Sequence, residues 1–136
     1  MDFLKSIMVA ASGLKAQSGR MRVIAENIAN ADSVSRTAGG KPYRRRIPVM
    51  ETSFSRTLEA QVVTAGRPID DKAEFGLRYM PGHPAANDNG YVSTPNVNPL
   101  IETMDMRAAQ RSYEANLNVI TAARRMMQRT IDILRI

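Results

Sequence analysis

The chain has 136 residues, which suits one domain, and its 43% hydrophobic content contrasts with only 5% aromatic residues and no Trp. We therefore expect a sparse core in which methionines fill the gaps between helices. The absence of cysteine excludes disulfide and thiolate chemistry, and the net charge of +6 is spread as +2 over each of residues 1–31, 32–98 and 99–136, so no basic domain or tail stands out.

The first residues lack the features of a targeting segment. No basic residues precede the first apolar side chains, and no stretch approaches the roughly 20 apolar residues of a membrane span. We therefore expect a soluble chain without a cleavable secretion signal and without a membrane-spanning helix.

Residues 1–31 predict an amphipathic helix. Apolar and small residues recur there in alternating steps of three and four, which is typical of a seam that packs on a partner helix. This N-terminal seam contains Leu4, Ile7, Ala11, Leu14, Ser18, Met21, Ala25 and Ile28. Gly13 and Gly19 each weaken the helix by about 1 kcal/mol, and we expect it to end near Asn30, Asp32 and Ser33.

Residues 32–98 lose the helical period and hold every proline except Pro99. Short strands are expected within residues 43–54, 61–64, 76–80 and 91–94. Pro48 lacks a backbone donor, so the first of these is an edge strand or a broken one. The segment predicts a small twisted β-ribbon with long loops, set at one end of a helix pair.

Residues 99–136 carry the strongest periodic signal. Asn98 suits an N-cap and Pro99 the first helical position. At about 1.5 Å per residue, one helix of up to about 55 Å is expected. Its apolar stripe, the C-terminal stripe, contains Met106, Ala109, Tyr113, Leu117, Ile120, Met127, Ile131 and Leu134.

The two helical segments together predict the fold class. We expect a mainly α protein in which residues 1–31 and 99–136 pack as an antiparallel, coiled-coil-like pair, with residues 32–98 as a β-ribbon and loop region between them. An apolar stripe is most often simply core. Two helices packed on each other bury only one face of each, however, and the C-terminal helix carries a second apolar row. The second row contains Ile101, Ala108, Ala115, Ala122, Met126 and Ile133. The exposed rows indicate a helical assembly protein that uses both helices as subunit interfaces.

Candidates for catalysis are few. His83, the only histidine, lies between prolines in a rigid turn, and no cysteine or serine elbow accompanies it. Asp70, Asp71 and Glu74 lie in a polar loop where nothing would raise a carboxyl pKa. An enzyme with a site around His83 and Asp70–Asp71 remains an alternative, but no catalytic residue is predicted.

Metal and nucleotide motifs are incomplete. The run Asn87–Gly90 resembles part of a calcium loop, but the first and twelfth positions would be Ala85 and Asn96 rather than carboxylates. A turn before a strand explains it better. Gly39–Lys41 lacks the spacing of a phosphate-binding loop. We predict no metal and no cofactor.

The hypothesis of nucleic-acid binding depends on Arg44, Arg45 and Arg46 beside Tyr43, since arginines neutralise phosphates and an aromatic ring can stack on a base. Three consecutive residues of an extended run point to alternating faces, and nearby acidic groups dilute the field. A charged edge ribbon, or arginines paired with acidic groups of a neighbouring subunit, is favoured. A small basic nucleic-acid-binding protein remains the main alternative.

Five segments resemble the bacterial flagellar rod, hook and filament-type axial proteins. They are SGLKAQSGRMRVIAENIANADS (12–33), KPYRRR (41–46), PGHP (81–84), GYVSTPNVNP (90–99) and DMRAAQRSYEANLNVITAARRMMQ (105–128). They occur in order over the whole chain and are most similar to the proximal-rod members. The resemblance singles out Asn27 and Asn30 at the end of the N-terminal helix, together with loop positions. The loop positions are Pro81, Gly82, His83, Pro84, Pro95, Asn96 and Asn98.

This resemblance implies a structural subunit of the flagellar basal body that polymerises through its terminal helices into a drive shaft that crosses the periplasm and transmits torque. It implies export through the flagellar type III apparatus without signal cleavage. The implied partners are copies of the chain itself, other proximal and distal rod subunits, the MS-ring with its adaptor subunit, and the export apparatus. It implies no enzyme activity, no nucleic acid and no small-molecule substrate.

Overall fold

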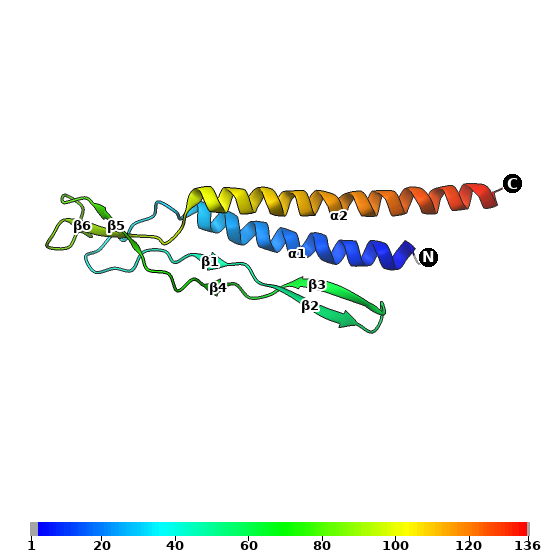
Figure 1. Cartoon of the computed structure of the whole chain (residues 1–136), viewed down its shortest axis with the longest axis horizontal. Helices are drawn as coiled ribbons and strands as arrows, with labels where there is room; N and C mark the ends of the chain where they lie inside the picture. The colour runs from blue at the N-terminus through cyan, green and yellow to red at the C-terminus, as the bar shows by residue number, and fades with distance from the viewer. Residues whose placement is uncertain (1–2, 136) are drawn as a thin grey trace. The chain divides into compact units, whose positions relative to one another are not determined.

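The computed structural model describes residues 3–135, which form two long helices, α1 (Phe3–Ala29) and α2 (Pro99–Leu134), with six short strands between them (Figure 1). The strands are β1 (Arg46–Ile47), β2 (Met50–Ser55), β3 (Ala60–Ala65), β4 (Ile69–Asp70), β5 (Gly76–Tyr79) and β6 (Tyr91–Thr94). The predicted terminal helices are confirmed. The strands make "mainly α" only part of the description.

Both helices begin or end at the expected signals. The side-chain oxygen of Asn98 accepts a hydrogen bond from the Leu100 N–H at 3.0 Å, and Pro99 is the first residue of α2. At the other end of α1, the Asn30 side chain donates to the Glu26 carbonyl at 2.8 Å, which satisfies one of the last carbonyls of the helix.

The strands form three separate antiparallel pairs, β1 with β4, β2 with β3, and β5 with β6. Pro48 lies between β1 and β2, which confirms the predicted break in that extended stretch. Strand β4 was not predicted, because two residues are too few to show an alternating pattern.

The chain divides into two compact units, each made of segments distant in sequence. Unit 1 comprises Met1–Met21, Val49–Arg67 and Arg107–Ile136, and unit 2 comprises Arg22–Pro48 and Pro68–Met106. Unit 1 therefore contains the hairpin β2–β3, and unit 2 contains the other two strand pairs. Both helices pass from one unit into the other.

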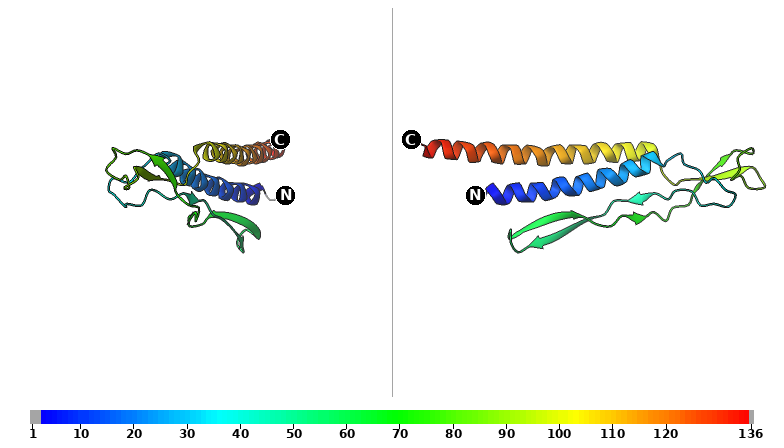
Figure 2. Two further views of the ribbon diagram at one scale, coloured as in Figure 1. Left: turned by 60° about the vertical axis from the view of Figure 1, so that its left-hand side comes forward. Right: turned by 180° about the vertical axis from the view of Figure 1, so that it is seen from behind.

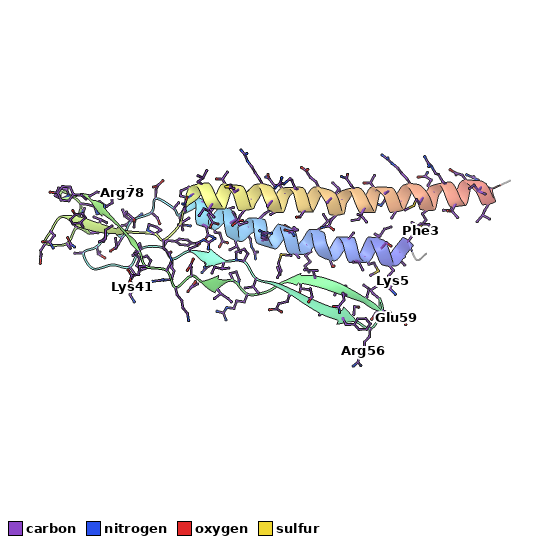
Figure 3. The ribbon with its side chains drawn as sticks, in the orientation of Figure 1. Phe3, Lys5, Lys41, Arg56, Glu59 and Arg78 are labelled. Atoms are coloured by element: carbon purple, nitrogen blue, oxygen red, sulfur yellow. The ribbon has the colours of Figure 1, made fainter. Side chains whose placement is uncertain are left out.

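In unit 1 the hairpin lies along α1 rather than at one end of the helix pair, which corrects the sequence-based expectation (Figures 1 and 2). The Val63 N–H donates to the Ser12 hydroxyl at 3.3 Å, and Lys5 Nζ lies 3.8 Å from a Glu59 carboxylate oxygen (Figure 3). Gly19 has no side chain and so leaves room for Ala65, since a Cβ at position 19 would lie 2.7 Å from the Ala65 Cβ. A glycine that weakens the isolated helix thus permits hairpin packing.

Unit 1 also places α1 and α2 side by side in opposite directions (Figures 1 and 2). Gly13 faces Asn116, because a Cβ on Gly13 would lie 2.9 Å from the Asn116 amide nitrogen. In antiparallel helices, Phe3 is then level with Met126, ten residues away on each helix. The end of α2 therefore extends past the first described residue of α1 (Figure 2).

The buried side chains are mostly small, as the composition predicts. In unit 1 they include Ala10, Ala16, Ala109 and Ala123, and in unit 2 Val23, Ile24, Ala31 and Val92. Such residues hold helices close but remove little apolar surface from water. Neither α1 nor α2 has the length of apolar sequence that a bilayer crossing would require.

Candidate subunit interfaces

A buried polar cluster holds unit 2 together. It consists of Asn27, Tyr43, Arg45, Asp71, Asn96 and Glu102. Asn27 lies at its centre and is 0% exposed. Its amide nitrogen donates to the Arg46 carbonyl at 2.7 Å and to Glu102 at 3.0 Å, and its oxygen accepts from the Tyr43 hydroxyl and the Arg46 N–H, each at 2.9 Å. All four hydrogen-bonding positions of the amide are filled.

Arg45 joins this cluster to the start of α2. Its Nε lies 2.6 Å from a carboxylate oxygen of Glu102, whose side chain is 1% exposed, and its NH1 lies 3.2 Å from Asp71. The Arg45 backbone N–H donates to the Asn96 side chain at 2.7 Å. A buried carboxylate is tolerated here because a guanidinium and an amide both bind it.

Electrostatics within the cluster follow from these contacts. The hydrogen bond to Glu102 raises the pKa of Arg45, so its charge is permanent. The Ala73 N–H, and then Arg45, stabilise the Asp71 carboxylate and lower its pKa below 3.8. Burial raises the pKa of the Tyr43 phenol, so the hydroxyl stays protonated at neutral pH and donates a hydrogen bond to the Asn27 side-chain oxygen.

The basic run at residues 44–46 is engaged inside the chain. Arg44 lies 4.2 Å from the centre of the Phe75 ring and donates to the backbone oxygens of Asp71 and Ala73. Arg46 pairs with Glu26 at 3.4 Å. All three arginines therefore have partners within this chain, and pairing with a neighbouring subunit stays a prediction.

The N-terminal seam is largely unburied. Leu4 is 62% exposed; Ala11, Ser18 and Ala25 are exposed, and Ile7, Leu14, Met21 and Ile28 are half-buried. The side chains that α1 buries fall on another line. They are Ala10, Ala16, Gln17, Val23, Ile24 and Asn27. The chain's own packing thus uses a different face from the seam, and Asn27, predicted at a subunit interface, is inside the chain.

The C-terminal stripe changes character along α2. Ala109 is 0% exposed and therefore also inside the chain, and Met106, Tyr113 and Ile120 are half-buried. Leu117, Met127, Ile131 and Leu134 are 47%, 36%, 58% and 79% exposed. The far end of the helix, past the level of Phe3, is left without a covering from α1.

The loop positions that the resemblance singled out lie in unit 2, outside its helices and strands or at the start of α2. The His83 N–H donates to the Met80 carbonyl at 3.0 Å, and its ring nitrogen Nδ1 accepts from the Ala85 N–H at 3.1 Å. Pro95 is buried, Asn96 belongs to the polar cluster, and Asn98 caps α2. The ring of His83 thus stabilises a turn. Asp70, the other residue considered for catalysis, lies exposed in β4.

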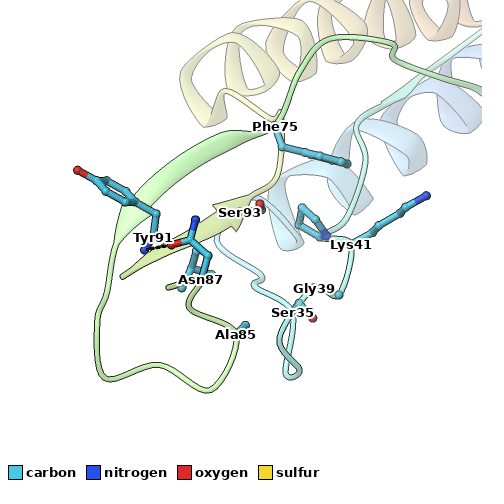
Figure 4. A pocket seen from close by; sticks show the side chains of 11 residues that line it. Ser35, Gly39, Lys41, Phe75, Ala85, Asn87, Tyr91 and Ser93 are labelled. Carbon is cyan, nitrogen blue, oxygen red and sulfur yellow. Dashed lines mark hydrogen bonds between the residues drawn. The ribbon is translucent and has the colours of Figure 1, made fainter. Parts of the chain in front are cut away.

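The Asn87–Gly90 run forms the predicted turn. The Asn87 side-chain oxygen accepts from the N–H groups of Asn89 and Tyr91, and Gly90 has a φ of +80°. A cavity of about 320 Å³ adjoins it, lined by the turn at residues 35–42 and by Phe75, Tyr91 and Ser93 (Figure 4). Within residues 3–135, no cluster of histidine and carboxylate groups has the arrangement of a metal site.

Comparisons with known proteins address the same segments. The family model described as "Flagella basal body rod protein" matches residues 7–36, and "Flagellar basal body rod FlgEFG protein C-terminal" matches residues 88–133. A flagellar basal-body rod protein FlgC from Agrobacterium fabrum is 45% identical over 93% of this chain and 91% of its own. The FlgC proteins of Salmonella typhimurium and Aquifex aeolicus are 38% and 36% identical, over 98% and 97% of both chains.

The chain belongs to the FlgC family of flagellar basal-body rod proteins. This is a family of structural rod proteins and not of enzymes. The nucleic-acid alternative is not favoured. The matched ranges contain most of α1 with the turn that follows it, and β6 with most of α2. They include three of the five segments that carried the resemblance in sequence, and residues 41–46 and 81–84 lie outside them.

Sequence reasoning missed the polar cluster around Arg45 and Glu102. The two residues are 57 positions apart, and nothing in their local sequence links them. One signal was available: Glu102 lies three residues into α2 on the side of the helix that packs inward, where an acidic residue requires a partner.

Proposed function

We propose that this rod protein polymerises through the exposed apolar rows of its terminal helices. The observation that carries the proposal is the mismatch between these rows and the chain's own packing, since the N-terminal seam and the outer part of the C-terminal stripe stay accessible. Long apolar rows left in water favour association with similar surfaces.

Helical geometry supports one composite surface in unit 1. At 100° per residue, the seam lies roughly 100° around α1 from the line of Gly13 and Gln17 that faces α2, and the stripe lies roughly 50° around α2 from the line of Ala109, Asn116 and Ala123. Because the helices are antiparallel, both offsets fall on the same side of the pair. A neighbouring subunit could then pack against both helices together, as in a coiled-coil-like layer.

The end of α2 supplies the second part of the surface. Met127, Ile131 and Leu134 continue the stripe beyond the described part of α1, where a neighbouring subunit would cover them. Contacts between unlike faces do not close on themselves, and they generate an extended helical array. Residues 1–31 and 99–136 form the core layer in this proposal, and residues 32–98 cover it.

The relatives' names support a place in the rod of the flagellar basal body. We assign the chain to the proximal rod crossing the periplasm, where it contacts copies of itself, other proximal and distal rod subunits, and the MS-ring with its adaptor subunit. Export through the flagellar type III apparatus without a cleaved signal precedes assembly. Torque is transmitted through the interlocked helices and needs no reactive residue.

The test introduces a charge into the composite surface. Leu117→Asp places a carboxylate on the stripe, whereas Thr130→Asp places the same group on an exposed polar position roughly 100° around the helix from the stripe. Because both sites are exposed, each variant keeps the stability of the purified chain within about 1 kcal/mol.

In a strain that lacks its own copy, Leu117→Asp is expected to be exported but to give no basal bodies by electron microscopy and no swimming. Thr130→Asp is expected to restore both. Normal basal bodies in the Leu117→Asp strain would contradict the proposal.

A further inference from the structure

A line of arginines runs along α2 in unit 1. Arg107, Arg111, Arg125 and Arg129 are all exposed. Arg125 is 18 residues, or five full turns, after Arg107, and Arg129 stands in the same relation to Arg111, so all four lie within an arc of about 40°. We call these four residues the arginine stripe.

No ion pair within the described part of the chain engages the arginine stripe. None of the four guanidinium groups lies within 4 Å of an acidic side chain among residues 3–135. Arg107 with Arg111, and Arg125 with Arg129, are like-charge neighbours at a spacing of four, which opposes helix formation. Glu114 and Asp132, three residues after Arg111 and Arg129, offset this in part, so the face keeps an excess of two positive charges that gains when carboxylates approach it.

The stripe lies on the face of α2 turned away from α1. Ala109, Asn116 and Ala123 point toward α1, and the arginines are roughly 160° around the helix from them. It is thus a different surface from the apolar one proposed above, and its occupant can differ.

A second copy of the chain is a poor occupant. Unit 1 contains 11 basic and five acidic residues, whereas unit 2 contains eight of each, so the whole charge of +6 belongs to unit 1. Glu114 and Asp132 repeat the 18-residue spacing on this face of α2, but they are single carboxylates against pairs of arginines, so the face keeps a net positive charge. Copies brought together at this face would repel.

We propose that the arginine stripe docks a helix of a different protein, one that carries two pairs of carboxylates 18 residues apart on one face. The repeat of five turns equals about 27 Å, and it matches a partner helix lying along α2. Each arginine would then bind one carboxylate through parallel N–H donors.

The gap between the two arginine pairs favours a helix over a uniform anionic surface. It holds Ala115, Asn118 and Ala122, which are exposed and small enough for a helix to approach closely, together with Glu114. A nucleic-acid duplex or an anionic bilayer presents negative charge throughout and would be repelled by Glu114. A helix with an uncharged middle would not.

The experiment uses the full chain and two dye-labelled peptides, held helical by side-chain bridges, of identical composition. The matched peptide has glutamates at positions i, i+4, i+18 and i+22, and in the shifted peptide the second pair moves by two residues, which rotates it by about 200° off the face. Binding is followed by fluorescence anisotropy at low salt, with a DNA duplex and phosphatidylglycerol vesicles as further probes.

The matched peptide is expected to bind about fourfold more tightly than the shifted one, since the shift removes two of the four exposed ion pairs and each contributes a factor of about two. Arg107→Gln, Arg111→Gln, Arg125→Gln and Arg129→Gln together should abolish this preference. A control with the same loss of charge, at Arg22, Arg36, Arg56 and Arg67, should keep it, and so should Leu117→Asp, which disables only the apolar surface.

Equal binding of the two peptides, or no binding of the matched one at low salt, would overturn the proposal. So would duplex or vesicle binding as tight as that of the matched peptide and dependent on the same four arginines, because the stripe would then be a site for polyanions.

Discussion

At the scale of single residues, Asn27 is the position on which unit 2 depends most. Its two donors and two acceptors satisfy groups from the loop before β1, from β1 itself and from α2, at sequence separations of 16, 19 and 75 residues. The resemblance indicated that Asn27 matters. Its role could not be predicted from the sequence, because a buried amide is defined by partners that local patterns do not reveal.

Replacing Asn27 by Ala should destabilise the chain by about 2–4 kcal/mol, because the Tyr43 hydroxyl and the Arg46 N–H and carbonyl lose their partners in a dry environment. The measurement is the urea midpoint followed by far-UV circular dichroism. Asn30→Ala is the control, since it removes one hydrogen bond at a half-buried position and should cost about 1 kcal/mol or less. Equal midpoints for the two variants would refute the assignment.

Asp71 gives the cluster a pH dependence of known sign. Its pKa is lower in the folded chain than its ordinary value of 3.8, so the carboxylate contributes stability above about pH 3.8 and loses it as the pH falls through the folded pKa. Wild type should therefore exceed Asp71→Asn in free energy of unfolding by a constant amount near neutral pH, and the gap should narrow below pH 4. Urea unfolding between about pH 6 and 2 measures it. A gap that widens on acidification would be inconsistent with the Arg45 contact.

At the scale of elements, local signals predicted the ends of the helices and the broken strand, because caps and prolines act through their own backbone. The face that each helix buries was harder to predict. The N-terminal seam has the better apolar period, yet α1 buries the neighbouring line with Ala10, Gln17 and Ile24, since Gly13 and Gly19 let α2 and the hairpin approach there. In the sequence, glycine predicts a weaker helix, whereas in the structure Gly13 and Gly19 are the positions where other elements can pack closely on α1.

Gly19→Ala tests this packing. A methyl group 2.7 Å from the Ala65 Cβ forces the hairpin away from α1, at about 1–3 kcal/mol for overpacking, against a gain of about 1 kcal/mol in helix propensity. We expect a net loss of stability in urea, reversed by adding Ala65→Gly. Gly82→Ala is the control, because nothing lies within 4 Å of a Cβ at that position. A Gly19→Ala chain more stable than wild type would show that the hairpin does not pack closely there.

At the scale of the whole molecule, the net charge is distributed unevenly between the two units, although each of residues 1–31, 32–98 and 99–136 carries +2. The compact units are assembled from separated segments, so charges summed along the chain differ from charges summed in space, and unit 1 alone carries the net +6.

The end of α2 separates folding from assembly within one chain. Ile131 and Leu134 are exposed and lie past the level of Phe3, so Ile131→Gln with Leu134→Gln should change the free energy of unfolding by less than about 0.5 kcal/mol. The same double variant should fail to enter basal bodies, because the surface offered to the neighbouring subunit becomes polar. Immunoblots of isolated basal bodies measure the second effect, with Asp132→Gln, on the opposite side of the helix, as the control. Incorporation of the double variant into basal bodies at the wild-type level would show that no neighbouring subunit packs on α2 beyond Met126. A large decrease in the free energy of unfolding would show that this end of the helix already packs within its own chain.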